Sequence, residues 1–385
     1  MSGRFEKKKE KKTGGWKKAL LIVLLVLVVL VAALVVAVVV YYNAALNKLN
    51  KVEVPKIDYQ ALATETTQAE TTAATTEATT EETTVATEPH VASSEDYINI
   101  LLIGQASREG EAERFADTMI LCTVNTYEKT LTMTSLLRDT LVQYPQYTDT
   151  AGKSHTGGKI KLTTIYHNGY ICTRSTADAM GLMNLTLYKN FGIEVDHDIE
   201  VDFDAFVKII DLIGGVNVDL TAAEAKYLNK EGFAAEEGRF HLDGGPALCY
   251  VRMRKAEGDN ESDIKRTERQ RRFMSEVLHR LKKLSLSDIQ NIANEVLPMV
   301  TVSMSNSEIT DLLLKLIPML PELEIKFSGT CPVRARGYSW GDSVDIYGDG
   351  FMHSVMLYDM DKNIEYMRAV TKGEGEIPET IPIDE

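Results

Sequence analysis

The sequence lacks the residue patterns that define several familiar kinds of site. Its cysteines are few, and they do not have the spacing of a zinc site: Cys122, Cys172, Cys249 and Cys331. The chain also has no serine-centred nucleophile elbow, no phosphate-cradling glycine loop and no internal repeat. These absences argue against a zinc protein, an α/β-hydrolase and a P-loop enzyme. The sequence allows two interpretations of the cysteines: they form disulfides, or they are buried free thiols.

Positive charge is also scarce. The 42 Lys and Arg residues are outweighed by 56 Asp and Glu residues, and the net charge is −14. This balance argues against a general nucleic-acid-binding protein, and no helix-turn-helix pattern favours a transcription regulator. The exception is the N-terminus, because residues 1–18 hold eight basic and two acidic residues. We expect no nucleic-acid partner.

One long apolar run follows this basic tail. Ala19–Val40 contains 22 residues without a charge, and Trp16 and Tyr41 flank it. As a helix the run extends about 33 Å, enough to cross a bilayer. A cleaved signal peptide is the alternative, but its apolar region is usually shorter. We predict a cytoplasmic tail over 1–18, a transmembrane helix over 19–42 and an extracytoplasmic remainder in a cell membrane of Gram-positive type.

Aromatic residues are missing between Tyr59 and Tyr97. Residues 61–90 contain 12 Thr, 7 Ala and 6 Glu. Such a segment cannot bury enough apolar surface to offset the entropy lost on ordering. The composition predicts a disordered stalk over 43–95 that spans about 40 Å as a flexible coil.

Strands and helices alternate after residue 96, which predicts an α/β fold with a central mixed sheet flanked by helices on both faces. The expected strands are Tyr97–Gly104, Thr118–Asn125, Thr130–Ser135, Ile199–Phe203 and Val216–Leu220. The expected helices are Ser175–Tyr188, Asp204–Ile213 and Thr267–Leu284, with capping boxes at Thr221, Ser287 and Ser305. We place the main domain at 96–283, its C-terminal part at 284–362 and an acidic tail at 363–385.

Arginines cluster between residues 250 and 270. Arg252 and Arg254 alternate on an expected strand and would share one face. Asp263, Arg266 and Gln270 follow at helical spacing, and Arg269 lies beside them. A solvated helix would also carry such charges. However, Arg binds phosphate bidentately, and the surrounding domain is acidic. A second pair, Arg138 and Asp139, ends a strand where α/β sheets tend to bind ligands.

These motifs together resemble the LytR-CpsA-Psr (LCP) family of extracytoplasmic phosphotransferases. The motifs that carry the resemblance are NILLIG at 99–104, DTMIL at 117–121, SLLRDT at 135–140, KLTTIYHNG at 161–169, VDFDAFVKIIDLIGGVNVDL at 201–220, HLDGGPALCYVRMR at 241–254 and DIKRTERQ at 263–270. They cover roughly 96–283. The anchor and the stalk also suit the family.

The resemblance implies transfer of an undecaprenyl-pyrophosphate-linked anionic glycopolymer, such as a teichoic acid or a capsular polysaccharide, to peptidoglycan. By resemblance, the pyrophosphate would be bound by Arg138, Lys161, Arg252, Arg254, Arg266, Arg269 and Gln270. Catalysis would involve Arg138, Asp263 and Arg266, and Asp117 would bind Mg²⁺ together with the substrate. An Arg cage with Mg²⁺ suits phosphoryl transfer, which requires positioning and neutralisation of negative charge.

Two positions differ from the family's pattern. Gln105 and Ala106 stand where the family has an Asp, and Phe115 stands where it has an Arg. Either Glu111, Glu113 or Arg114 takes over these roles through a shifted loop, or this protein is weakened in activity or altered in its substrate. The alternative functions are a lipid-pyrophosphate hydrolase and a non-catalytic binding module for polyprenyl phosphate or glycan.

Overall fold

A computed structural model describes residues 43–63, 93–105, 113–253 and 263–375. Contacts within the chain separate residues 1–48 from a larger unit that begins at Leu49. The expected membrane helix Ala19–Val40 lies outside the described residues. Within the described ranges, no helix is both long enough and apolar enough to cross a bilayer.

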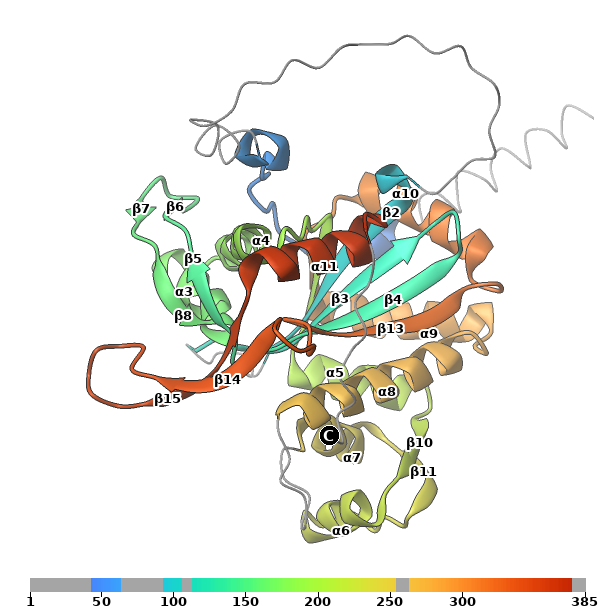
Figure 1. The fold of residues 1–385 in the computed structure, drawn as a ribbon. Coiled ribbons are helices and arrows are strands. Elements are labelled where there is room, and N and C mark those ends of the chain that lie inside the picture. Colours follow the sequence, from blue (N-terminus) through green and yellow to red (C-terminus); the bar gives the residue numbers. More distant parts are fainter. Residues whose placement is uncertain (1–42, 64–92, 106–112, 254–262, 376–385) are drawn as a thin grey trace, which may run out of the picture. The chain divides into compact units, whose positions relative to one another are not determined.

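In the described part of the chain, seven strands form one mixed sheet in the order β1-β12-β9-β2-β3-β4-β13 (Figure 1). The strands β2, β3 and β4 are antiparallel neighbours, whereas β9 and β13 run parallel to β2 and β4. This arrangement confirms the predicted mixed α/β fold. The strand bounds are β1 Asn50–Lys51, β2 Tyr97–Gln105, β3 Ala116–Asn125, β4 Thr130–Leu136, β9 His197–Val201, β12 Val300–Val302 and β13 Glu324–Cys331.

Helices cover both faces of the sheet, and the central strands therefore bury side chains on both sides. Leu101 and Leu121 belong to a core with helices α3 (Leu162–Thr173), α4 (Thr176–Phe191) and α11 (Met360–Lys372). Ile100 and Ile120, their neighbours along the strands, belong to a second core with α8 (Asp263–Leu281) and α10 (Asn306–Leu316). Successive strand residues therefore alternate between the two faces.

A third core forms beside α8. It is built by α5 (Phe203–Leu212), β10 (Val216–Leu220), α6 (Ala222–Lys230), β11 (Gly238–Leu242) and α7 (Gly244–Arg252) (Figure 1). Phe273 of α8 is buried in this core, whereas Met274 also contacts the core under the sheet. Helix α8 thus joins this group to the sheet.

The remaining elements are short or peripheral. They are η1 Ser94–Asp96, β5 Leu141–Tyr144, β6 Tyr147–Thr148, β7 Ser154–His155, β8 Gly158–Lys161, α9 Leu286–Val296, η2 Leu297–Met299, η3 Ile317–Met319, β14 Ser339–Val344 and β15 His353–Tyr358. All four cysteines lie in the described ranges and are free: Cys122 and Cys331 are buried, Cys249 is half-buried and Cys172 is exposed.

Four local features differ from the sequence-based expectations. The expected acidic tail does not begin at residue 363, because helix α11 continues to Lys372 and buries Tyr366 in the core. Part of the expected stalk joins the folded unit, because Asn50–Lys51 pairs with β12 and the Tyr59 ring packs 4.8 Å from the Tyr188 ring. Arg252 ends a helix rather than lying on a strand. The cap of α9 is formed by Ser285, which bonds Asp288, whereas the backbone of Ser287 already lies inside the helix. In each case, contacts with distant segments or the residues on either side determined the structure, and the short sequence pattern used for the prediction did not.

A buried carboxyl group on β9, on the face that α4 covers, predicts how stability depends on pH. Burial raises the pKa of Asp198 to about 7, and Asn184 Nδ2 donates to its Oδ2 at 3.0 Å. The folded protein therefore retains a proton that the unfolded chain has lost between roughly pH 4 and 7. We expect the free energy of unfolding to fall across this window, by at most about 1.4 kcal/mol per pH unit from this group.

Asp198→Asn should remove that part of the pH dependence, because an amide of the same shape does not titrate. Urea unfolding of the full chain in detergent at pH 5 and pH 7 measures the difference. Parallel pH dependence in the wild type and the variant would contradict the prediction.

Candidate functional site

The site begins where β3 starts and β4 ends, which are adjacent because the two strands are antiparallel. Arg138 Nη1 lies 2.7 Å from Asp117 Oδ1, and both side chains are largely buried. Arg138 Nε lies 3.6 Å from Asp139 Oδ2, and Lys161 Nζ lies 2.9 Å from Asp139 Oδ1. The predicted residues Asp117, Arg138 and Lys161 are thus linked by alternating charges.

Helix α8 brings two further predicted residues to the same place. Arg266 Nη2 donates to the backbone carbonyl of Asp117 at 3.3 Å. One turn later, Gln270 Nε2 donates to Thr118 Oγ1 at 2.9 Å and to the Val251 carbonyl at 3.2 Å. Both side chains are buried. The expected helical face therefore lies directly against the start of β3.

A polar cavity of about 590 Å³ opens at this point. Asp117, Arg252, Arg266 and Gln270 line it, together with three aromatic residues that the sequence did not identify: Phe203, Tyr227 and Phe233. The guanidinium of Arg252 stacks 4.4 Å from the centre of the Phe203 ring. Such stacking fixes the direction of the cation and leaves its N–H groups available to an anion.

A second cavity, of about 250 Å³, adjoins the first and is almost entirely apolar. It lies between the sheet, α5, α7 and α8, and its walls include Ile120, Phe206 and Met274. The two cavities share Thr118, Phe203, Leu248, Arg252 and Gln270. A molecule with a charged head and an apolar tail would meet both kinds of surface in succession.

Arg269 is oriented differently from the prediction. Its Nη2 donates to the Met253 carbonyl at 2.6 Å, and its Nη1 lies 3.7 Å from Glu224 Oε1. The side chain is buried and does not line either cavity. The structure thus assigns Arg269 to the packing of α8 on α6 and α7, because its guanidinium turns away from the cavity toward Met253 and Glu224.

Comparison with known proteins identifies the family and the fold. The sequence model of the LytR_cpsA_psr family matches residues 59–326. The chain belongs to this family.

The curated relatives include proteins named as transferases and one named as a regulatory protein. The polyisoprenyl-teichoic acid–peptidoglycan teichoic acid transferase TagU of Halalkalibacterium halodurans is 31% identical over 195 residues, which are 50% of this chain and 56% of that protein. Biofilm regulatory protein A of Streptococcus mutans is 30% identical over 215 residues, 54% of this chain and 50% of that protein. The chain spans about half the length of the curated relatives it matches.

Solved structures show the same fold. TagT bound to LIIa-WTA superposes with a TM-score of 0.52 at 22% identity, covering 74% of this chain and 93% of that chain. A Streptococcus agalactiae protein superposes with a TM-score of 0.56 at 23% identity, covering 74% and 91%. This similarity supports the fold alone.

The departures from the LCP pattern have a structural counterpart. Arg114 does not line the polar cavity: its Nη1 pairs with Glu200 Oε1 at 3.2 Å, and its guanidinium stacks 4.4 Å from the Tyr170 ring. Phe115 stacks on His167, with ring centres 4.7 Å apart. Tyr166 also donates a short hydrogen bond to Glu200, whose pKa is raised by burial. The shifted arginine therefore belongs to a neighbouring network.

Several predicted positions lie outside the described residues: Arg254, Ala106 and Glu111. The backbone of Asp263 begins α8, but its side chain is also outside the described part. Of the missed aromatics, Phe203 has a sequence signal, because it follows the helix cap Asp202 directly after β9. Tyr227 and Phe233 reach the cavity only through the packing of α6 on α7, which no local pattern shows.

Proposed function

We propose that this protein is an extracytoplasmic phosphotransferase that attaches an undecaprenyl-pyrophosphate-linked anionic glycopolymer to peptidoglycan. The observation that carries the proposal is the arginine-containing polar cavity adjoining an apolar one. A prenyl pyrophosphate has the matching order of charged head and apolar tail. The names of the curated relatives support the same reaction class.

In the proposed reaction, a sugar hydroxyl of peptidoglycan attacks the polymer-linked phosphorus, and the bond to the prenyl phosphate breaks. Arg252 and Arg266 would hold the pyrophosphate, while Arg138, oriented by Asp117 and Asp139, would neutralise charge on the transferred group. Positioning and charge neutralisation are what phosphoryl transfer requires. Asp263, which begins α8 beside Arg266, is proposed as a further catalytic residue.

If water replaced the sugar hydroxyl as acceptor, the same site would hydrolyse the lipid pyrophosphate. An assay that offers both acceptors distinguishes the two reactions: the full chain in detergent is incubated with an undecaprenyl-pyrophosphate-linked polymer, peptidoglycan oligomers and Mg²⁺. Polymer–peptidoglycan conjugate with released prenyl phosphate is the expected product. Release without conjugate would identify a hydrolase, and retention of uncleaved lipid would identify a binding module.

A magnesium ion is proposed to arrive with the substrate. Among the described residues, no cluster of three or more His, Cys, Asp or Glu residues could hold a metal ion. Asp117 would contribute one oxygen, because Arg138 already binds the other side of this carboxylate. Mg²⁺ gives up water reluctantly, so substrate phosphate oxygens would have to complete its shell. When bound, the ion would neutralise phosphate charge.

We therefore expect the protein without lipid to bind Mg²⁺ weakly, and Mg²⁺ and prenyl pyrophosphate to tighten each other by the same factor. Isothermal titration in both orders tests this equality. Gln105→Asp should raise Mg²⁺ affinity in the absence of lipid, with Gln105→Asn as its control. Tight Mg²⁺ binding by the lipid-free wild type, lost in Glu113→Gln, would contradict the prediction.

The proposed location is the outer face of the cell membrane, with the apolar run 19–40 as anchor. The basic N-terminal tail favours a cytoplasmic N-terminus. Protease treatment of intact cells should then remove the folded unit. Its protection, with digestion only after cell lysis, would overturn the topology.

A further inference from the structure

A second cluster of reactive side chains lies on the other side of the sheet from α8. Cys172, in the last turn of α3, places its Sγ 3.6 Å from His155 Nδ1. His155, on β7, places its Nε2 2.8 Å from Asp149 Oδ2. A thiol, an imidazole and a carboxylate in this order form the arrangement of a cysteine nucleophile with an oriented base.

The carboxylate of this cluster is firmly held. Asp149 is 5% exposed, and its Oδ1 accepts backbone N–H groups of Ala151 at 3.0 Å and Lys153 at 2.9 Å. The hydrogen bond from His155 and the Lys153 N–H hold the pKa of Asp149 below its usual range. A charged Asp149 fixes the proton of His155 on Nε2, which leaves Nδ1 as the acceptor that faces Cys172.

A tyrosine completes the group. The Tyr147 ring stacks on His155 with centres 4.8 Å apart, and its hydroxyl lies 3.6 Å from Cys172 Sγ and 3.5 Å from the Asn168 carbonyl. Burial raises the pKa of Tyr147, so the phenol stays protonated. A developing oxyanion next to the sulfur would compete successfully with the neutral carbonyl for this O–H, because hydrogen bonds to charged acceptors are stronger.

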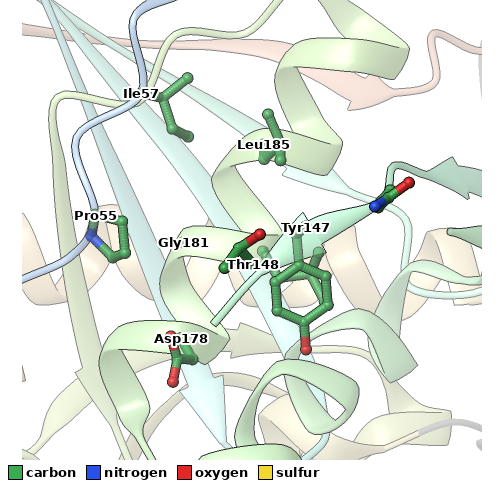
Figure 2. Close-up of a pocket in the computed structure, with 9 residues that line it drawn as sticks. Pro55, Ile57, Tyr147, Thr148, Asp178, Gly181 and Leu185 are labelled. Atoms are coloured by element: carbon green, nitrogen blue, oxygen red, sulfur yellow. The ribbon is translucent and has the colours of Figure 1, made fainter. Parts of the chain in front are cut away.

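Tyr147 also lines a cavity of about 410 Å³ (Figure 2). Pro55 and Ile57 lie on one side of this cavity and Tyr147 on the other, with Leu185 and Asp178 between them (Figure 2). The wall is closely fitted, because a Cβ on Gly181 would lie 3.2 Å from Pro55 Cδ. The carboxylate of Asp178 is already engaged by the backbone and hydroxyl of Thr150, and Pro55, Ile57 and Leu185 give the cavity an apolar wall. Of the four clustered residues, Tyr147 alone lines this cavity.

We propose that Cys172, His155, Asp149 and Tyr147 form a second active site that transfers small acyl groups from esters or thioesters. Cys172 Sγ attacks the acyl carbon while its proton passes to His155 Nδ1, and Tyr147 donates to the carbonyl oxygen. The carbon–oxygen or carbon–sulfur bond of the substrate then breaks, and the leaving alcohol or thiol takes the proton from His155. Water, activated by His155, releases the carboxylic acid and restores the thiol.

This site is separate from the proposed phosphotransfer site. None of its four residues lines the polar or the apolar cavity. Cys172 is exposed and therefore accessible to a substrate, whereas Cys122 and Cys331 are buried and the pKa of each is raised by burial. The acyl-transfer proposal can consequently be tested without any phosphorylated lipid.

The probe is p-nitrophenyl acetate, added to the full chain in detergent. We expect a burst of about one p-nitrophenolate per chain, followed by slower turnover, with acetyl found on Cys172 by mass spectrometry. Cys172→Ala should abolish the burst. His155→Gln should slow acylation about 100-fold, the scale of a lost general base. Tyr147→Phe, which keeps the stacked ring, should slow it at least about 10-fold.

Two controls separate catalysis from ordinary thiol reactivity. His279→Gln makes the same substitution on the exposed surface of α8 and should leave the burst rate unchanged. Unchanged melting temperatures in Asp149→Asn and Tyr147→Phe would show that the fold is intact. A burst that persists in Cys172→Ala, or equal acylation rates in the wild type and His155→Gln, would overturn the proposal.

Discussion

Arg266→Ala should lower the rate of polymer transfer by about 1000-fold, the scale of a lost charge-stabilising donor in phosphoryl transfer. Arg266 donates to the backbone carbonyl of Asp117, lines the polar cavity and is 3% exposed. A cation in such a dry position interacts strongly with charge that develops in the transition state. The measurement is kcat for conjugate formation by the full chain with the lipid-linked polymer.

Loss of a buried arginine also risks the fold, so a second variant is needed. Arg252 is exposed and stacks on Phe203, and Arg252→Ala should fold normally. We expect it to weaken binding of the lipid pyrophosphate by about 1.5–3 kcal/mol, the scale of a charged hydrogen bond. Arg239→Ala removes a surface arginine paired with Glu276. It should change neither kcat for polymer transfer nor the affinity for the lipid pyrophosphate. Wild-type affinity in Arg252→Ala would refute the Arg-cage assignment.

Leu248→Trp should reduce turnover of the long prenyl substrate by at least about 100-fold. Leu248 lines both cavities, so the indole ring of tryptophan, which is larger than the leucine side chain, would narrow the space where they meet. A tail kept out of the apolar cavity would lose the free energy of burying its methylene groups, about 0.8 kcal/mol for each group. The measurement is kcat/KM for substrates whose prenyl chains differ in length.

The dependence on chain length distinguishes this effect from general damage. A pyrophosphate with a short prenyl chain should lose much less activity in Leu248→Trp than the undecaprenyl substrate does. Leu248→Met changes the volume little and should behave as the wild type. An equal loss for short and long chains would show that the apolar cavity does not receive the tail.

Much of the fold is determined locally. The strands β2, β3 and β4 follow from apolar runs separated by turn residues, and helix α6 follows from its capping box at Thr221 and Glu224. The same local logic places Arg266 and Gln270 on one face of α8, since residues four apart lie above each other on a helix. The order of the family motifs then indicates the class of chemistry.

The orientation of individual side chains is not determined locally. Arg266 and Arg269 are three residues apart on α8, yet one lines the polar cavity and the other pairs with Glu224. The choice depends on which face of α8 meets the sheet and which meets α6, a contact between segments more than 40 residues apart. Arg252 shows the same limit, because its alternating pattern indicated a strand and packing produced a helix end.

The sequence by itself therefore determined the family, the mixed sheet and the main charged and polar residues of the polar cavity, because hydrophobic periodicity and ordered motifs are carried by neighbours in the chain. Only the tertiary structure decided that Asn50–Lys51 joins the sheet, that the polar cavity adjoins an apolar one, and that Cys172 meets His155. These features depend on contacts between distant segments. Their free energy comes from burial and pairing that exist only once the chain has folded.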